Sequence, residues 1–317
     1  MNILNEIKVA ENRIRPYILK TPLILSNFLS KLNNGKVYLK LESEQYTGSF
    51  KARGAMNKIL SLSNEDKEKG IVTASTGNHA QGIARALSIS GIGGTIFLPE
   101  NSDSSKIDAL KDYGTSLAFY GNDCLTTELY AKQYANEKDA IWISPYNDPQ
   151  IIGGQGTIGI ELVQQLDHIE HVFATIGGGG LISGISTYLK SVKPDINIIG
   201  CLPENAPEMY LSVKAGKVII LEESKDTLSD GSAGGLEEGS ITFPICQQLV
   251  DEYSLVTEEE IKGAIKIMID NHHKIIEGAA GVSIASFIKN REKFDGMNVV
   301  IIICGRNIAT DKLKALL

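Results

Sequence analysis

Apolar, β-branched runs alternate with helix-like stretches along nearly the whole chain, and this alternation limits the possible folds more than any other feature. The expected strands are short and almost wholly apolar, as buried strands are: residues 37–41, 71–74, 95–98, 116–120, 172–176, 197–201 and 298–303. Helical patterns lie between them, among them residues 52–62, 80–90, 104–113 and 258–272. The alternation predicts an α/β protein with open parallel sheets covered by helices.

The strand–helix repeats between residues 71 and 120 follow one another closely and form a compact block. This block predicts a small domain, residues 47–147, inserted into a large domain made of residues 1–46 and 148–317. A length of 317 residues is typical of about two domains, and we expect the two to share a continuous sheet system. The chain ends shortly after the last expected strand, so we expect no appended regulatory domain.

Composition excludes several classes of protein. The chain is 43% hydrophobic and 22% charged, and it has no apolar run near the roughly 20 residues that a membrane helix needs. Its first residues lack the pattern of a secretion signal, and its four cysteines lie far apart, without metal-type spacing. A net charge of −7 argues against nucleic acid as a partner. We expect a soluble cytoplasmic protein with reduced thiols.

Four consecutive glycines, Gly177, Gly178, Gly179 and Gly180, lie between the expected strand 172–176 and a helical run from Leu181. Glycines at such a turn let the main chain close around phosphate oxygens, and the following helix adds its positive amino end. Close packing of helix against strand is the alternative explanation. The quartet therefore indicates a phosphate site only together with other features.

Lys51 is the first of those features, because Gly48, Ser49 and Phe50 precede it and it opens an expected helix. Most helical lysines are solvated surface residues. A lysine at a buried helix start, however, loses preference for its charged form and becomes a neutral nucleophile. An activated lysine and a phosphate cradle together suggest a phosphorylated aldehyde cofactor, and pyridoxal phosphate is the obvious candidate.

Asn78 and Cys304 follow other expected strands. Asn78, in the segment Ser75-Thr76-Gly77-Asn78-His79, is either a simple helix cap or part of a site for a substrate carboxylate and a cofactor hydroxyl. Cys304 comes directly after strand 298–303. Ligands bind at the carboxyl ends of such strands, although a buried cysteine is often only a small core residue.

Together these motifs resemble the fold-type II pyridoxal-phosphate enzymes, in particular the serine/threonine dehydratase (ammonia-lyase) and serine racemase family. The resemblance covers essentially the whole chain and implies two domains of the tryptophan synthase β-like type. The matching motifs, in chain order, are Thr21-Pro22-Leu23, Ser49-Phe50-Lys51-Ala52-Arg53-Gly54-Ala55, Ser75-Thr76-Gly77-Asn78-His79, Ile152-Gly153-Gly154-Gln155-Gly156-Thr157, the quartet Gly177–Gly180 and Glu277-Gly278-Ala279-Ala280-Gly281.

The resemblance also implies a role for each matching residue. Lys51 would be linked covalently to the cofactor and act as the base on its si face. The other cofactor-binding residues would be Phe50 against the pyridine ring, Asn78 at the ring hydroxyl, Gly177, Gly178, Gly179 and Gly180 at the phosphate, Glu277, and Cys304 near the ring nitrogen. Ser75, Thr76, Gly77 and His79 would surround the substrate carboxylate.

The reaction expected from this site is β-elimination from a β-hydroxy amino acid, namely L-threonine, L-serine or 3-hydroxyaspartate, to give a 2-oxo acid and ammonia. A thiol at Cys304 cannot keep the pyridine nitrogen protonated, so a leaving group should depart together with the α proton. The alternatives are racemisation, with the Thr76 hydroxyl as a second base, β-replacement, and a non-catalytic binding protein. A homodimer is expected from the resemblance alone.

Departures from the family pattern at three sites, one of them a pair of residues, leave the cation and the substrate open. Leu202 stands where an acidic cation ligand is usual, so we predict no metal site, although Glu204 and Glu208 remain nearby. Arg306 near the cofactor mouth would suit an acidic substrate such as 3-hydroxyaspartate if it faces inward. The acidic pair Glu237-Glu238 would disfavour such a substrate unless both carboxylates lie in solvent.

Overall fold

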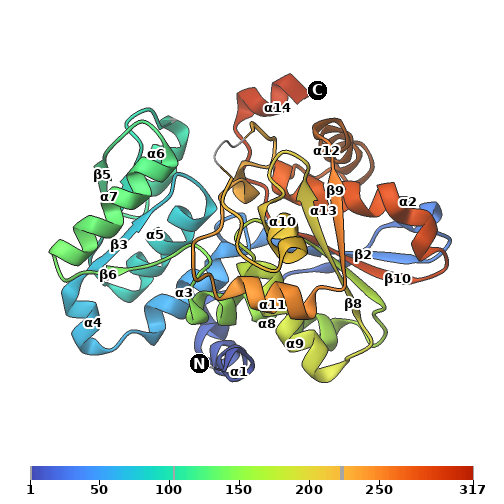
Figure 1. The fold of residues 1–317 in the computed structure, drawn as a ribbon, viewed down its shortest axis with the longest axis horizontal. Coiled ribbons are helices and arrows are strands. Elements are labelled where there is room, and N and C mark those ends of the chain that lie inside the picture. Colours follow the sequence, from blue (N-terminus) through green and yellow to red (C-terminus); the bar gives the residue numbers. More distant parts are fainter. Residues whose placement is uncertain (1, 103, 222–224, 317) are drawn as a thin grey trace.

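The computed structural model describes residues 2–102, 104–221 and 225–316, which form two lobes side by side (Figure 1). Each lobe has its own sheet, so the expected continuous sheet system is wrong, whereas the expected α/β class with parallel sheets is confirmed. The strands are β1 Leu23–Leu25, β2 Lys36–Leu41, β3 Ile71–Ala74, β4 Gly94–Leu98, β5 Ser116–Phe119, β6 Ile141–Trp142, β7 His171–Thr175, β8 Asn197–Pro203, β9 Glu252–Val256 and β10 Asn298–Ile303.

Helices cover both sheets. The longer ones are α1 Ile3–Ile14, α3 Lys51–Ser61, α5 Asn78–Ser90, α7 Cys124–Glu137, α8 Pro149–Gln165, α9 Gly180–Val192, α12 Glu258–His272 and α13 Gly278–Asn290. The shorter ones are η1 Arg15–Tyr17, α2 Asn27–Leu32, η2 Glu42–Glu44, α4 Asn64–Lys69, α6 Ser104–Lys111, α10 Glu208–Ala215, η3 Asp230–Ser232, α11 Thr242–Leu249, η4 Arg291–Phe294 and α14 Thr310–Leu316.

The larger sheet has the order β1-β2-β10-β7-β8-β9 and is parallel except for β1, which runs antiparallel to β2. Its central strands β7 and β10 are buried on both faces, which explains their continuous apolar sequence. Because β7 and β10 are parallel neighbours, the segments that follow them leave the sheet at the same edge. These segments are the glycine quartet and Cys304.

The smaller sheet has the order β5-β4-β3-β6 and is parallel throughout. The strands expected from the sequence are all present in the two sheets, with bounds that differ by at most two residues. Strands β1, β6 and β9 were not expected. β1 and β6 are only three and two residues long, and β9 (Glu-Tyr-Ser-Leu-Val) has too mixed a sequence to stand out.

Helix α3 connects the two lobes. Its residues Met56 and Ile59 belong to the apolar core of the smaller lobe, which also contains Ile14 and Ile151 from outside the predicted small domain. The exact division of the chain into domains therefore stays a prediction. The amino-terminal part of α3 crosses α8 so closely that a Cβ atom on Gly154 would lie 2.6 Å from the Cα of Gly54. Glycine at this crossing allows the two helix backbones to touch.

Candidate active site

A cavity of about 430 Å³ lies at the carboxyl edges of the strands. It brings together every residue predicted for the site: Phe50, Lys51, Ser75, Thr76, Gly77, Asn78, His79, Gly177, Gly178, Gly179, Gly180, Glu277 and Cys304. These residues come from loops after β3, β7 and β10 and from the starts of α3, α5, α9 and α13. Their convergence is a structural fact, while the role of each residue stays a prediction.

Lys51 is the first residue of α3, as predicted, and its side chain reaches into the cavity. Its Nζ donates a hydrogen bond to the carbonyl oxygen of Pro145 at 2.7 Å, and the ring of Phe50 lies 5.2 Å from Nζ. Burial lowers the pKa of Lys51 to about 8, although the acidic groups of Cys304 and Glu277 oppose this shift. Roughly a tenth of the amine is therefore uncharged at pH 7, far more than for an ordinary lysine, and the uncharged form is the one that a nucleophilic lysine requires.

The glycine quartet connects β7 to α9, which begins at Gly180. Gly179 has a φ of +84°, a left-handed conformation that side chains disfavour. A Cβ on Gly178 would lie 2.3 Å from the ring of Tyr146, and one on Gly177 would lie 2.8 Å from the backbone of Ser232. The loop is thus closed to any side chain, and it presents main-chain N–H groups and a helix amino end to the cavity. These features fit a phosphate group.

Asn78, Glu277 and Asn307 form a hydrogen-bonded group in the cavity. The Asn78 Nδ2 donates to both carboxylate oxygens of Glu277 at 2.9 Å. The Asn307 Nδ2 donates to Asn78 Oδ1 at 2.6 Å, and its backbone N–H donates to Glu277 at 3.2 Å. Burial raises the pKa of Glu277 to about 7, despite these hydrogen bonds. The amide of Asn78 is therefore fixed in orientation at the site predicted for a ring hydroxyl.

Cys304 directly follows β10, and its Sγ lies 4.0 Å from an oxygen of Glu277. Burial, together with the neighbouring Glu277 carboxylate, raises the pKa of the Cys304 thiol well above its usual value. The group therefore stays a neutral thiol at physiological pH. Such a group offers a cofactor ring no negative charge that would hold a proton on it.

The segment from Ser75 to His79 joins β3 to α5 and forms one wall of the cavity. Ser75 Oγ accepts a hydrogen bond from the backbone N–H of Gly77 at 3.2 Å, and Thr76 lies beside Cys124. His79 Nε2 lies 3.0 Å from Thr73 Oγ1, and burial lowers the pKa of His79 to about 3. The imidazole is therefore neutral, so a substrate carboxylate at this wall would depend on hydroxyl and N–H donors.

Tyr146 and Asn307 also line the cavity but were not among the predicted site residues. The hydroxyl of Tyr146 accepts a hydrogen bond from the backbone N–H of Glu237 at 2.7 Å, while its ring covers the glycine loop. The sequence holds one usable signal for each: Asn307 is close to Cys304, and Tyr146 lies just before residue 148, where the chain is expected to return to the large domain. Neither signal identifies the contacts that these side chains make.

Two features of the sequence bear on whether an acidic substrate could bind: Arg306, which would favour it, and the pair Glu237-Glu238, which would disfavour it. Arg306 is half exposed and its Nη1 pairs with Glu44 at 2.8 Å, outside the residues that line the cavity, so the inward orientation is wrong. Glu238 is exposed, as expected of a solvated loop charge. Glu237 differs from that expectation, because it is half-buried and pairs with Lys132 at 2.9 Å. Its charge is thereby largely compensated.

The two acidic residues considered as cation ligands, Glu204 and Glu208, have different surroundings. Glu204 lies 3.7 Å from Lys289, and Glu208 is buried, which raises the pKa of its carboxyl. Among the described residues, no group of three or more His, Cys, Asp or Glu side chains has an arrangement that could hold a metal ion.

No helix in the described part of the chain is long and apolar enough to cross a membrane.

The fold and the cavity define a class of enzyme. A buried lysine of lowered pKa, a glycine cradle and a fixed amide on one cavity wall form a site for a phosphorylated aldehyde cofactor. The family model described as "Pyridoxal-phosphate dependent enzyme" matches residues 14–305. The chain therefore belongs to this family of pyridoxal-phosphate-dependent enzymes.

Several known proteins are similar over nearly the whole chain. The L-threonine ammonia-lyase of Thermotoga maritima is 40% identical over 319 residues, which cover 100% of this chain and 78% of the relative. The structure of the processed form of threonine deaminase isoform 2 from Solanum lycopersicum has a TM-score of 0.95 and 36% identity, covering 99% of this chain and 86% of that one. Maize serine racemase has a TM-score of 0.92 and 32% identity, covering 98% and 97%.

Proposed function

We propose that the protein is an ammonia-lyase that uses pyridoxal phosphate to eliminate water from a β-hydroxy amino acid, with L-threonine as the principal substrate. The observation that carries this proposal is the neutral Cys304 thiol, which shares one cavity with the Lys51 amine and the glycine cradle. The similarity to proteins named threonine ammonia-lyase and threonine deaminase supports both the reaction and the substrate.

The residues present fit the cofactor. Gly177, Gly178, Gly179 and Gly180 would hold its phosphate, Asn78 its ring hydroxyl and Cys304 its ring nitrogen. When bound, pyridoxal phosphate joins covalently to an amine and withdraws electrons from the α carbon of an amino acid. Phe50 lies close enough to Lys51 to cover the ring on that side.

Lys51 is the base in this proposal. Because its pKa is about 8, its amine can accept the α proton near neutral pH and release it again afterwards. The donors along Ser75, Thr76 and Gly77 orient the substrate carboxylate, while the neutral ring of His79 supports this wall. Loss of the β-hydroxyl with the α proton leaves an enamine product, which hydrolyses to a 2-oxo acid and ammonia.

L-Threonine and L-serine fit the cavity charge better than 3-hydroxyaspartate does. Arg306 is paired with Glu44 and offers no cation inside the cavity for a second substrate carboxylate. Glu128 also lines the cavity and lies 2.8 Å from Lys132, which is shared with Glu237. One lysine facing two carboxylates leaves no net positive charge at this part of the cavity for an acidic side chain, and Lys106, which also lines the cavity, lies by Cys124.

Proton NMR of the cofactor-loaded protein in heavy water tests this proposal, with L-threonine, L-serine and 3-hydroxyaspartate supplied separately. We expect L-threonine to disappear fastest while 2-oxo acid accumulates, and we expect Lys51→Ala to abolish turnover. Racemisation is the second candidate, because the Thr76 hydroxyl lies in the cavity wall. Exchange of the α proton with formation of D-amino acid and little oxo acid would replace the elimination proposal by racemisation.

We also propose a cytoplasmic homodimer with a small domain of residues 47–147. The resemblance to the family supports the dimer, and the separate four-stranded sheet supports the domain. Light scattering of the purified protein measures the oligomeric state directly.

A further inference from the structure

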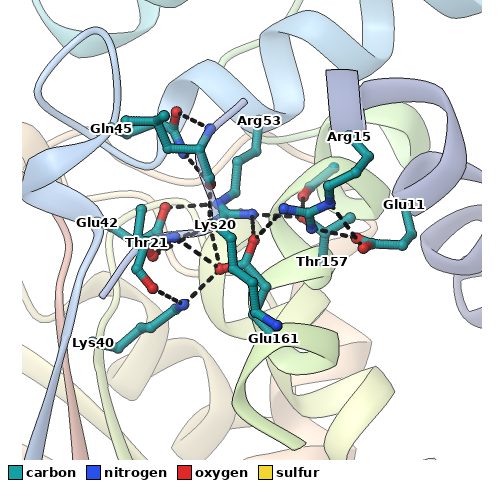
Figure 2. Close-up of polar contacts among 12 residues, drawn as sticks. Glu11, Arg15, Lys20, Thr21, Lys40, Glu42, Gln45, Arg53, Thr157 and Glu161 are labelled. Atoms are coloured by element: carbon teal, nitrogen blue, oxygen red, sulfur yellow. Dashed lines mark hydrogen bonds and ion pairs between the residues drawn. The ribbon is translucent and has the colours of Figure 1, made fainter. Parts of the chain in front are cut away.

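A largely buried group of charged side chains packs against the side of α3 that faces away from the cavity (Figure 2). Its centre is Arg53, which lies two residues after Lys51 and has no exposed surface. Two residues correspond to about 200° of rotation around a helix. Lys51 and Arg53 therefore point in nearly opposite directions from the same helical turn.

The guanidinium of Arg53 uses all five of its N–H groups. It forms a bidentate pair with Glu42, Nε to Oε2 at 2.7 Å and Nη2 to Oε1 at 2.8 Å. A second bidentate pair with Glu161 joins Nη1 to Oε1 at 2.8 Å and Nη2 to Oε2 at 2.9 Å. The remaining N–H of Nη1 donates to Thr157 Oγ1 at 3.1 Å. Two such forks fix both the position and the plane of the group.

The surrounding side chains neutralise and orient the two carboxylates. Lys40 is fully buried and its Nζ lies 2.5 Å from Glu161, and Arg15 pairs with the same carboxylate at 2.8 Å from the outer side. Thr21 Oγ1 donates to Glu42 at 2.5 Å. Buried ion pairs are often no more stabilising than apolar side chains of the same volume. Stability alone therefore does not account for five directed donors on one residue.

The partners of Arg53 belong to the larger lobe, because Glu42 directly follows β2 and Glu161 lies on α8. Among the described residues, no side chain caps the amino end of α3, where Phe50 is the cap residue. A second attachment in the same turn is the Gly54 N–H, which donates to Gln155 Oε1 of α8 at 3.2 Å. The turn that begins with Lys51 is thus held to the larger lobe from its far side.

We propose that Arg53 is a positioning residue for Lys51: its double fork holds the first turn of α3 so that the Lys51 amine stays in the cavity beside the Pro145 carbonyl. This inference rests on the proposed role of Lys51 as the cofactor-binding lysine. Arg53 itself touches neither the cavity nor a substrate. It acts only through the helix that it shares with Lys51.

The test uses the cofactor-free protein and the variant Arg53→Lys, which keeps the charge but loses the planar fork. The rate at which an amine-specific acylating reagent modifies Lys51 is followed across pH by peptide mass spectrometry. We expect the apparent pKa of Lys51 to rise from about 8 toward the ordinary lysine value, because a loosened turn admits water. Affinity for added pyridoxal phosphate should fall on the order of tenfold, since an Arg-to-Lys change at a bidentate site is not conservative.

Arg15→Gln is the matched control, because Arg15 pairs with Glu161 but lies outside α3. It should leave the Lys51 titration and the cofactor affinity close to wild type. Thr157→Val removes one acceptor of Arg53 at nearly constant volume, and it gives a smaller shift in the same direction if Arg53→Lys does not fold.

The inference is overturned if Arg53→Lys lowers the melting temperature but leaves the apparent pKa of Lys51 the same as in Arg15→Gln. The same outcome in Thr157→Val overturns it if Arg53→Lys does not fold. The labelling needs no turnover, so its result is independent of the reaction that the enzyme catalyses. If Arg53→Lys shifts the apparent pKa of Lys51 but the wild-type protein has no lyase activity, the proposed function is contradicted while the role of Arg53 is supported.

Discussion

The Lys51 amine is the single group in which burial and chemistry are most clearly linked. Its position at the start of α3, beside the Pro145 carbonyl, removes water from the ammonium and lowers its pKa to about 8. Glu277 experiences the reverse effect, since burial raises the pKa of its carboxyl to about 7. Both shifts favour the uncharged form, so the cofactor-free cavity carries less charge than its residues suggest.

This burial has a consequence for stability. The pKa of Lys51 in the folded protein is lower than its ordinary value of 10.5, so the unfolded chain binds more protons between about pH 8 and 10.5. Below that window the buried ammonium destabilises the folded protein by up to about 3 kcal/mol. We expect Lys51→Met to gain stability relative to wild type at pH 7, and the gain to decline as pH rises through the window. Urea unfolding of the cofactor-free proteins at pH 7, 8, 9 and 10 measures this difference. A difference independent of pH would contradict the burial argument.

At the scale of single elements, the turn between β7 and α9 determines whether a phosphate can bind. A Cβ on Gly178 would lie 2.3 Å from the ring of Tyr146, so the turn packs tightly against the segment before α8. Contacts of this kind also show the limit of sequence analysis. The glycine quartet, Lys51 and Asn78 could be predicted because each lies in a local strand–turn–helix pattern. Tyr146 could not, because its contacts join segments far apart in the chain.

The fit between Gly178 and Tyr146 gives a prediction for that element. Gly178→Ala should weaken pyridoxal phosphate binding about tenfold or more, because overpacking typically costs 1–3 kcal/mol and here displaces the loop backbone. Gly263→Ala is the matched control, since a Cβ there meets no described atom within 4 Å. Fluorescence titration with the cofactor measures the affinity of both variants. If the clash is the cause, Tyr146→Ala combined with Gly178→Ala should cost less affinity than the sum of the single changes. Additive losses would mean that the Tyr146 ring is not the obstacle.

At the scale of the whole molecule, the two lobes meet around the cavity and are connected on both sides of it. Arg53 and its carboxylates connect α3 to the larger lobe. No local pattern indicates this contact, because Glu161 is 108 residues from Arg53 and Glu42, 11 residues before it, belongs to a different element. On the other side, Lys132 of α7 pairs with Glu237 at 2.9 Å, and Ser144 donates to the same carboxylate at 3.3 Å. The parallel sheets could be predicted from their apolar strands, whereas these connections needed the structure.

The Lys132–Glu237 pair joins the smaller lobe to the segment after η3, which also carries the cavity-lining Gly234. Both side chains are about 30% exposed, so the pair should contribute less than about 1 kcal/mol to global stability. Its larger effect should be on the geometry of the closed cavity. We expect Lys132→Met to raise the KM for L-threonine up to about fivefold, with kcat nearly unchanged and little change in melting temperature. Wild-type KM should also rise with added salt, because salt screens exposed ion pairs.

Lys190→Met provides a matched comparison for that variant. Lys190 pairs with Asp251 at 2.9 Å and has similar exposure, but both residues lie in the larger lobe. Steady-state kinetics of both variants at low and high salt separate the two possibilities. If only Lys132→Met raises KM and loses the salt dependence, the pair between the lobes sets how firmly the substrate is enclosed. If the two variants behave alike, the contact is an ordinary surface ion pair, and cavity closure depends on the buried contacts of Tyr146 and Arg53 instead.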